Sequence, residues 1–209
     1  MSEFVVMKNV KKTYKMGEVM IHAVDGVDIE IHKGEFAVIV GPSGAGKTTV
    51  LNMLGGMDRV TSGKVIVDGR DISLYNSRQL TKYRRDDIGF VFQFYNLIPT
   101  LTAYENVALT KSIVKNAASA DEMLAAVGLA DHKDKFPSQL SGGEQQRIAI
   151  VRAILKPGDI VLADEPTGSL DPEMSQKAFD LIRTLRDQFG KTILVANDYS
   201  TLAMKKCGA

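Results

Sequence analysis

Residues 41–49 combine glycines, a lysine and hydroxyls at a spacing suited to binding phosphate. They read GPSGAGKTT and fit the pattern G-x-x-x-x-G-K-[ST] directly after the apolar run FAVIV. In such a loop the backbone N–H groups surround phosphate oxygens, and the helix that follows adds positive potential. We expect Lys47 to reach the β and γ phosphates of a nucleotide and Thr48 to bind Mg²⁺. The expected nucleotide contacts are Gly41, Ser43, Gly44, Ala45, Gly46, Lys47, Thr48 and Thr49.

A second chemical element is the carboxylate pair Asp164 and Glu165, which ends the apolar run IVLADE. A strand-end aspartate is suited to holding Mg²⁺ beside bound phosphates. The next carboxylate, Glu165, is placed to orient or deprotonate an attacking water, although a solvated turn residue or helix cap is the plainer interpretation. Together with the phosphate loop, the pair favours hydrolysis of the bound nucleotide.

An open α/β sheet is needed to bring these residues together. Apolar runs predict buried strands at 36–41, 88–93, 159–165 and 192–197. Helical spacing predicts helices at 142–155 and 173–189, with Pro172 suited to a first turn. Strands that alternate with helices indicate a mostly parallel sheet flanked by helices, as in a P-loop NTPase.

Two further regions differ from this alternating pattern. EFVVMKNV and HAVDGVDIEIH predict an antiparallel β subdomain at the N-terminus, and residues 77–139 are mainly helical in pattern, as a helical subdomain would be. No repeat or linker divides the chain, so we expect one domain over residues 1–209.

Composition narrows the class of protein. The chain has 209 residues, 44% of them hydrophobic, which is enough for a substantial core. Its 26 basic and 25 acidic residues argue against a dedicated nucleic-acid binder. A single cysteine, Cys207, and the absence of an apolar leader favour the cytoplasm. No apolar run approaches the roughly 20 residues that span a bilayer, so membrane work would need another chain.

The segment LSGGEQQRIAIVRAIL (residues 140–155) resembles the signature of ABC-type ATPases, and ordered matches extend this resemblance over nearly the whole chain. It implies that Tyr14 stacks on adenine, where the plainer interpretation is a surface aromatic. It also implies that Gln93, otherwise a strand-end amide, touches Mg²⁺ or the attacking water. Asp164 and Glu165 become the metal and catalytic carboxylates of an ATPase.

The resemblance also implies a head-to-tail dimer. The Ser141-Gly142-Gly143 turn opens a helix and exposes N–H groups, which makes an anion site. In the family this turn lies far from the phosphate loop of its own subunit and closes over the γ-phosphate held by the other. Ser169-Leu170-Asp171 resembles the loop that crosses the dimer interface, with Asp171 near the nucleotide.

Two segments resemble a particular subfamily, the lipoprotein-release and macrolide-export ATPases of LolD and MacB type. They are YRRDDIGFVFQFYNLIPTLTAYENV and LADEPTGSLD. Such ATPases work with FtsX-like permeases, which implies a location in the cytoplasm, peripheral on the inner face of the cell membrane. The charge run 82–87 is ordinarily a solvated helix face, but in this family the neighbouring region docks the permease's coupling helix.

The chain departs from the family at Ala196-Asn197-Asp198, where the family typically has Thr-His-Asp and the histidine contacts the γ-phosphate. Asparagine can donate a hydrogen bond but cannot carry a proton or positive charge. Loss of one transition-state donor costs about 2.7 to 4 kcal/mol, and the Asn197 amide would restore part of this. His22, His32 and His132 match no catalytic element and are interpreted as ordinary surface or strand residues.

A second departure is the ending STLAMKKCGA, where relatives continue with a further strand and hairpin. A shortened chain, a fragmentary gene and a naturally short chain all fit, and each predicts an uncovered sheet edge. Three functions follow from the sequence. The leading hypothesis is an ATPase that powers a membrane permease. The alternatives are an ATP-binding but hydrolysis-impaired regulatory or degenerate subunit, favoured by Asn197, and an ATPase acting on nucleic acid or ribosomes, disfavoured by the neutral charge.

Overall fold

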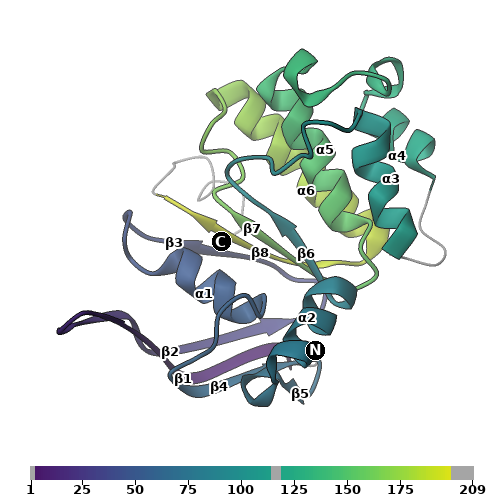
Figure 1. Cartoon of the computed structure of the whole chain (residues 1–209). Coiled ribbons are helices and arrows are strands. Elements are labelled where there is room, and N and C mark those ends of the chain that lie inside the picture. The colour runs from purple at the N-terminus through teal and green to yellow at the C-terminus, as the bar shows by residue number, and fades with distance from the viewer. Residues whose placement is uncertain (1–2, 114–118, 199–209) are drawn as a thin grey trace.

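The computed structural model describes residues 3–113 and 119–198, with side chains described up to residue 110 and again from 119. Four strands form an antiparallel sheet in the order β2-β1-β4-β5 (Figure 1). Their bounds are β1 Glu3–Met16, β2 Val19–His32, β4 Ser62–Val67 and β5 Arg70–Asp71. The predicted antiparallel subdomain is confirmed, and β4 and β5 extend it beyond the two segments that the pattern indicated.

The second sheet is parallel and has the order β3-β8-β7-β6. Its strands are β3 Phe36–Val40, β8 Thr192–Asn197, β7 Ile160–Asp164 and β6 Ile88–Val91. Each lies inside one of the four predicted strand ranges, and all pairings in this sheet are parallel. The predicted α/β class, with a mostly parallel sheet, is therefore confirmed.

Six α-helices lie in the described residues: α1 Lys47–Leu54, α2 Ser77–Asp86, α3 Ala103–Ile113, α4 Ala120–Ala126, α5 Gly142–Ile154 and α6 Pro172–Phe189. Three short 3-10 helices accompany them: η1 Ile72–Leu74, η2 Ala130–His132 and η3 Pro137–Gln139. The predicted helix starts are confirmed, since Ser141 caps α5 and Pro172 occupies the first turn of α6.

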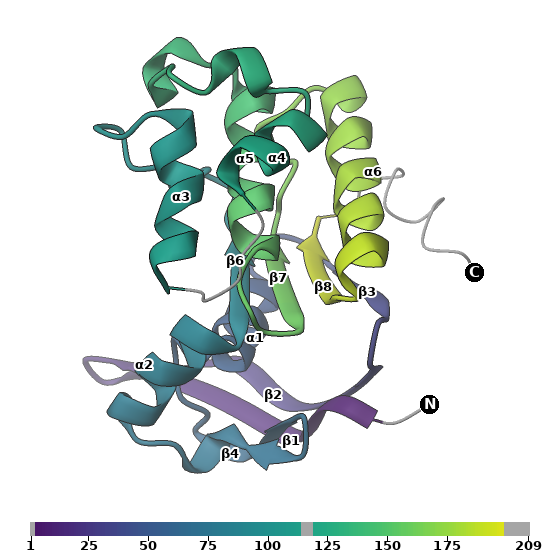
Figure 2. The ribbon, with the colours of Figure 1, turned by 90° about the vertical axis from the view of Figure 1, so that its right-hand side faces the viewer.

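The stretch 77–139 is not one helical insertion. It contains β6, which pairs with β7 inside the parallel sheet, and α2 precedes that strand. Only α3, α4, η2 and η3 form the helical region that stands apart from the sheet in Figure 2. The apolar run IGFV explains the division, because a continuous apolar run of this kind is typical of a parallel strand covered on both faces, and β6 adds such a strand beside β7.

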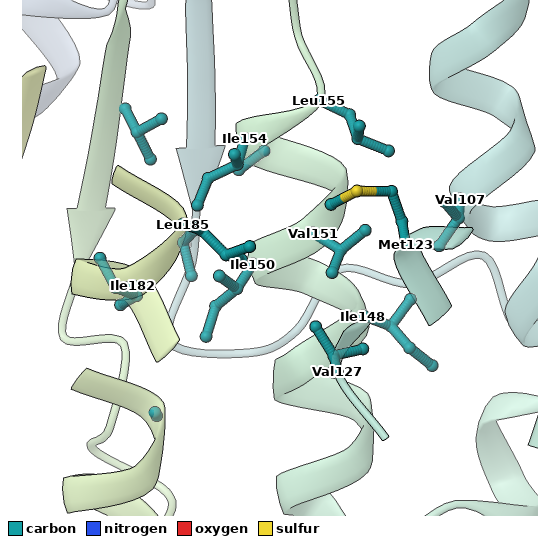
Figure 3. Close-up of a cluster of buried hydrophobic side chains, with 14 of the residues drawn as sticks. Val107, Met123, Val127, Ile148, Ile150, Val151, Ile154, Leu155, Ile182 and Leu185 are labelled. Carbon is teal, nitrogen blue, oxygen red and sulfur yellow. The ribbon is translucent and has the colours of Figure 1, made fainter. Parts of the chain in front are cut away.

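The parallel sheet separates two hydrophobic cores. On one face, alternate residues of β7 and β8, such as Val161 and Val195, pack with α5, α6 and the helical region, and Figure 3 shows the α5 side chains at its centre. On the other face, Leu162 and Leu194 pack with α1 and the antiparallel sheet. This two-sided burial follows from the period of two in a strand. Consequently α1 and α5 lie on opposite faces of the sheet.

The expectation of a missing C-terminal strand and the interpretation of Cys207 concern residues 199–209, which lie outside the described residues. Within the described part of the chain, no helix combines the length and the apolar character needed to cross a membrane.

Candidate active site

The carboxyl ends of the four parallel strands gather the predicted site residues at one edge of the sheet. The phosphate loop follows β3, Asn197 ends β8, Asp164 ends β7, and Gln93 lies two residues after β6. Ligands in open α/β sheets bind at this edge, because loops from neighbouring strands meet there. These residues lie more than a hundred positions apart in the sequence. They come together because neighbouring parallel strands end at the same edge of the sheet.

The phosphate loop has the backbone geometry that its glycines predict. Gly44 and Gly46 have φ values of 80° and 86°, in the left-handed region that favours glycine. Gly46 also lies against the antiparallel sheet, since a β-carbon there would be 2.3 Å from the carbonyl oxygen of Ala23 in β2. The helix α1 begins at the next residue, Lys47, so its N-terminus points at the loop.

Lys47 is buried, at 6% exposure, and lies at the centre of the site. Its Nζ donates to the carbonyl oxygens of Gly41 at 2.9 Å and Pro42 at 3.0 Å. It also forms an ion pair with the carboxylate of Asp198 and lies 3.9 Å from Oε1 of Glu165. The ammonium group therefore joins the phosphate loop to the ends of β8 and β7.

Thr48 and Asp164 are brought together as the expected metal ligands. Thr48 Oγ1 donates to Asp164 Oδ1 at 3.1 Å, across 116 positions of sequence. Burial raises the pKa of Asp164, and the hydrogen bond from Thr48 opposes this shift only in part. Two adjacent oxygen ligands, one of them a carboxylate, are suited to a hard cation such as Mg²⁺.

Glu165 adopts an unusual backbone conformation. Its φ is 44°, and its N–H donates to the carbonyl oxygen of Ala196 at 2.8 Å, which fixes the turn after β7 to β8. Burial and the neighbouring carboxylate of Asp198 raise its pKa. Strain at a non-glycine residue of this kind persists only where surrounding structure holds it, and it is common at active sites. A carboxylate with a raised pKa suits a general base.

Asn197 is the last residue of β8 and is 5% exposed. It pairs in register with Val40, the last residue of β3 before the phosphate loop, while Ala196 pairs with Asp164. Position 197 therefore lies between the phosphate loop and the two carboxylates. The amide occupies the place that the resemblance assigns to the family's histidine.

Gln93 lies in the loop after β6 and packs against the loop that precedes α6. Its amide is 3.1 Å from the place where a β-carbon of Gly168 would lie. Asp171, from the same loop, has a local role as the N-cap of α6, where its Oδ1 accepts from Met174 N at 2.9 Å. In this structure Asp171 therefore contacts its own helix.

The signature turn, residues 141–143, opens α5 with a capping box. Glu144 Oε2 accepts from Ser141 N at 2.7 Å and from Ser141 Oγ at 2.8 Å, and these bonds lower the pKa of Glu144. His132, expected to be an ordinary surface residue, lies with Nδ1 2.8 Å from Glu144 Oε1. Buried Gln146 ties the helix to the active-site edge, because its Nε2 donates to the carbonyl oxygen of Pro166.

Tyr14 lies near the end of β1 beside α1. Its hydroxyl donates to Asp58 Oδ2 at 2.7 Å, and Lys12 Nζ lies 4.7 Å from the ring centroid. Burial and Asp58 raise the pKa of the Tyr14 hydroxyl, whereas a hydrogen bond with the side chain of Thr49 lowers it. The ring is thus held next to the third residue of the phosphate-loop helix.

Sequence reasoning missed two residues of this site. Asp198 contacts Lys47, and an acidic residue directly after a strand end was the signal that could have found it. Tyr95 packs its hydroxyl against Gly142 of the signature turn. No spacing pattern indicates that contact, because Tyr95 lies in the irregular loop after β6, far in sequence from Gly142 at the start of α5.

Comparison with known proteins identifies relatives of this chain. Residues 24–168 match the protein-family model described as ABC transporter. The chain is 46% identical over 198 residues to the uncharacterized ABC transporter ATP-binding protein MJ0796 of Methanocaldococcus jannaschii, which covers 90% of this chain and 84% of that protein. A solved dimeric structure of MJ0796 in a post-hydrolysis state, bound to ADP and Pi, matches with a TM-score of 0.82 and 45% identity, covering 92% of this chain and 87% of that one.

Two named relatives identify the subfamily. The lipoprotein-releasing system ATP-binding protein LolD of Shewanella frigidimarina is 41% identical over 204 residues, covering 95% of this chain and 85% of that protein. The macrolide export ATP-binding/permease protein MacB of Brucella abortus is 43% identical over 194 residues, covering 90% of this chain and 30% of that protein. The chain therefore belongs to the ABC transporter family, as an ATP-binding cassette ATPase of the LolD/MacB-like subfamily.

Proposed function

We propose that this chain hydrolyses ATP to drive an FtsX-like permease, and that residue 197 sets a slow rate. The observation that carries the proposal is the convergence of Lys47, Thr48, Asp164 and Glu165 at the end of the parallel sheet. The phosphate-loop N–H groups and Lys47 bind the phosphates. Glu165 orients a water and accepts its proton as the water oxygen attacks the γ-phosphorus and ADP leaves.

Magnesium is the metal that this donor set fits. Thr48 Oγ1 and Asp164 Oδ1 would supply two oxygen ligands, and Gln93, from the loop after β6, would supply a third. When bound, the ion neutralises charge on the β and γ phosphates. The raised pKa of Asp164 supports this role, since a nearby cation favours the charged form that burial disfavours.

A second copy of the chain completes the site in this proposal. The signature turn belongs to α5, which packs on the opposite face of the parallel sheet from α1, so it does not reach the phosphate loop of its own subunit. Ser141, Gly142 and Gly143 of one copy then close over the γ-phosphate held by the other. The dimeric structure of MJ0796 with ADP and Pi supports this arrangement. Asp171 lies in the loop that would cross between the copies.

The permease would dock in a groove between the parallel sheet and the helical region. This groove, of about 400 Å³, is lined by apolar side chains that include Phe90, Phe92 and Ile98. Arg84, Arg152 and Lys156 also line it, and among the described residues that line it none is acidic. An apolar helix with an acidic residue fits such a surface, as the coupling helix of a permease would. MacB, whose name joins ATP-binding and permease functions, supports a partner of this class. The proposal places the chain in the cytoplasm, peripheral on the inner face of the membrane.

In this proposal, Asn197 is the residue that lowers the rate of ATP hydrolysis. Asn197 lies at the sheet edge between the phosphate loop and the carboxylates, where an amide can donate a hydrogen bond but cannot transfer a proton. The alternative function, a regulatory or degenerate subunit that binds ATP without useful hydrolysis, rests on the same residue. Nucleic acid is not a partner in either version, because the net charge is only +1.

Steady-state ATPase measurements test the proposal. The chain and Asn197→His are compared alone and with an FtsX-like permease of the same organism, and Glu165→Gln serves as the inactive control. We expect Asn197→His to raise the rate roughly 10- to 100-fold, less than the full value of one transition-state donor because the amide already provides part of it. Equal and rapid turnover by both proteins would contradict the role of residue 197. No turnover by Asn197→His would favour the regulatory alternative.

A further inference from the structure

The hairpin that joins β1 to β2 carries an apolar strip that its own subunit does not cover. Tyr14 pairs with Ile21 and Met16 pairs with Val19, in continuous antiparallel register. Paired residues, and residues two apart on a strand, share one face of a hairpin, so these four side chains form a single tip strip. Met16 is 66% and Val19 61% exposed, and Ile21 is also exposed. Exposed apolar residues that adjoin one another in this way indicate an interaction surface.

The strip is anchored at its inner end and free at its outer end. Asp58 accepts from Tyr14 Oη at 2.7 Å and from Lys12 Nζ at 2.6 Å, and these bonds hold the base of the hairpin to the loop after α1. The outer end extends past the body of the subunit, on the side where β3 connects to α1 (Figure 1). The strip therefore extends outward from Tyr14 and α1, where a molecule that binds this side of the subunit would meet it.

We propose that a second copy of this chain covers the tip strip when ATP closes the dimer, with its Phe136 packed on Met16 and Val19. This inference rests on the proposed function, in which the base stacks on Tyr14 and the partner copy's signature turn meets the phosphates. A partner that contacts the phosphates on this side also faces the strip, since the strip begins at the base-stacking residue. The surface covered by the second copy would then extend without a break from the nucleotide to the tip strip.

Phe136 is, among the described residues, the exposed large apolar residue nearest in sequence to the signature turn. It is 42% exposed and lies five residues before Ser141, outside the cores of its own subunit. Its position is fixed, because Gln139 Oε1 accepts from Phe136 N at 2.8 Å at the start of η3. A two-fold dimer uses each contact twice, so two strips and two phenylalanines would be buried together. Their burial would add an apolar contact beside the nucleotide base to the contact that the signature turn makes with the γ-phosphate.

The test uses Glu165→Gln as the parent, which we expect to retain ATP and accumulate the closed dimer because it lacks the carboxylate that accepts the proton of the attacking water. Met16→Asp with Val19→Asp places charges on the strip, and Leu74→Asp is the matched control, because Leu74 is 81% exposed on η1, away from the hairpin. We expect the strip variant to weaken ATP-dependent dimerisation roughly tenfold or more in analytical ultracentrifugation, from the apolar area lost. The Leu74 variant is expected to dimerise like the parent.

Binding of a fluorescent ATP analogue to the monomer is measured in parallel. Unchanged nucleotide affinity with weakened dimerisation supports the proposal. Unchanged dimerisation of the strip variant overturns it, and so does a loss of nucleotide affinity, which would show that the strip serves the base within one subunit. If the Glu165→Gln parent does not dimerise with ATP, the proposed function fails first, so the two failures are distinguishable.

A cross-link locates the contact. In a Cys207→Ser background, Val19→Cys and Phe136→Cys are combined in the Glu165→Gln parent and oxidised with and without ATP. A disulfide needs the two Cα atoms within about 7 Å, so its formation reports direct apposition. We expect an ATP-dependent intermolecular bond that neither single cysteine variant gives. Absence of the bond in a protein that still dimerises would contradict the pairing with Phe136.

Discussion

The hydroxyl of Tyr95 lies so close to Gly142 that a side chain at position 142 would have to displace it. A β-carbon on Gly142 would be 2.7 Å from that oxygen, closer than any ordinary contact. Tyr95 belongs to the loop that carries Gln93, and Gly142 belongs to the signature turn, so the loop after β6 sets the position of that turn from within the same subunit. Leu170 lies 3.8 Å from the same point and brings the loop before α6 into this contact.

This contact predicts a paired effect of two substitutions. Gly142→Ala is expected to lower ATP-driven dimerisation strongly, because the added methyl group pushes Tyr95 away. Tyr95→Phe alone removes only the hydroxyl, and combined with Gly142→Ala it is expected to restore most of the loss. Dimerisation in the Glu165→Gln background, measured by size-exclusion chromatography with ATP, checks the pair. No restoration in the double variant would mean that Gly142 is required for backbone reasons alone.

Asp198 is expected to weaken nucleotide binding. Its carboxylate pairs with Lys47, the ammonium group that must meet the phosphates, and adds negative charge at the site. Asp198→Asn removes one charge at contact distance, which is worth about 1 kcal/mol in water, so affinity for ATP should rise about fivefold. Titration with a fluorescent ATP analogue measures this change. Asp187→Asn, which changes the same charge at an exposed position on α6, is the control and should leave affinity unaltered.

The raised pKa of Asp164 predicts a pH-dependent stability difference. Since the folded state binds this proton more tightly than the unfolded state, charged Asp164 destabilises the fold above its folded pKa. Asp164→Asn keeps an acceptor for Thr48 and removes the charge, so its Tm should exceed that of the parent chain at pH 7 to 8. The difference should shrink as the pH falls toward the ordinary aspartate pKa. Calorimetry across pH 8 to 4.5 measures it, and a lower Tm for the variant at pH 7 would contradict the prediction.

The groove predicts a variant that separates ATP binding from permease coupling. Ile98→Asp places a charge in the apolar part of the groove without touching the phosphate loop. We expect unchanged nucleotide affinity and a loss of at least tenfold in the stimulation of ATPase activity by an FtsX-like permease. Leu74→Asp serves again as the exposed control. Full stimulation of the Ile98 variant would place the permease elsewhere.

The sequence predicted most of the fold because its signals are local. The phosphate loop follows an apolar strand directly, and Pro172 marks the start of α6 within one residue. What the sequence did not predict depends on distant segments meeting. Asp198 reaches Lys47 only because β8 lies beside β3 in parallel register. Tyr95 reaches Gly142, the first residue of α5, through the loop after β6, whose path no periodicity describes. The exposed face of the hairpin depends on its pairing register.

The contact between Gly46 and Ala23 makes the phosphate loop a joint between the two sheets. Gly46 lies in the connection from the parallel sheet to α1, whereas Ala23 is part of the antiparallel sheet, and their backbones meet without room for a β-carbon. A phosphate group held by this loop would therefore lock one sheet against the other. On that basis, bound nucleotide would make the two sheets move as one rigid body. A displacement of either sheet would then be transmitted to the other.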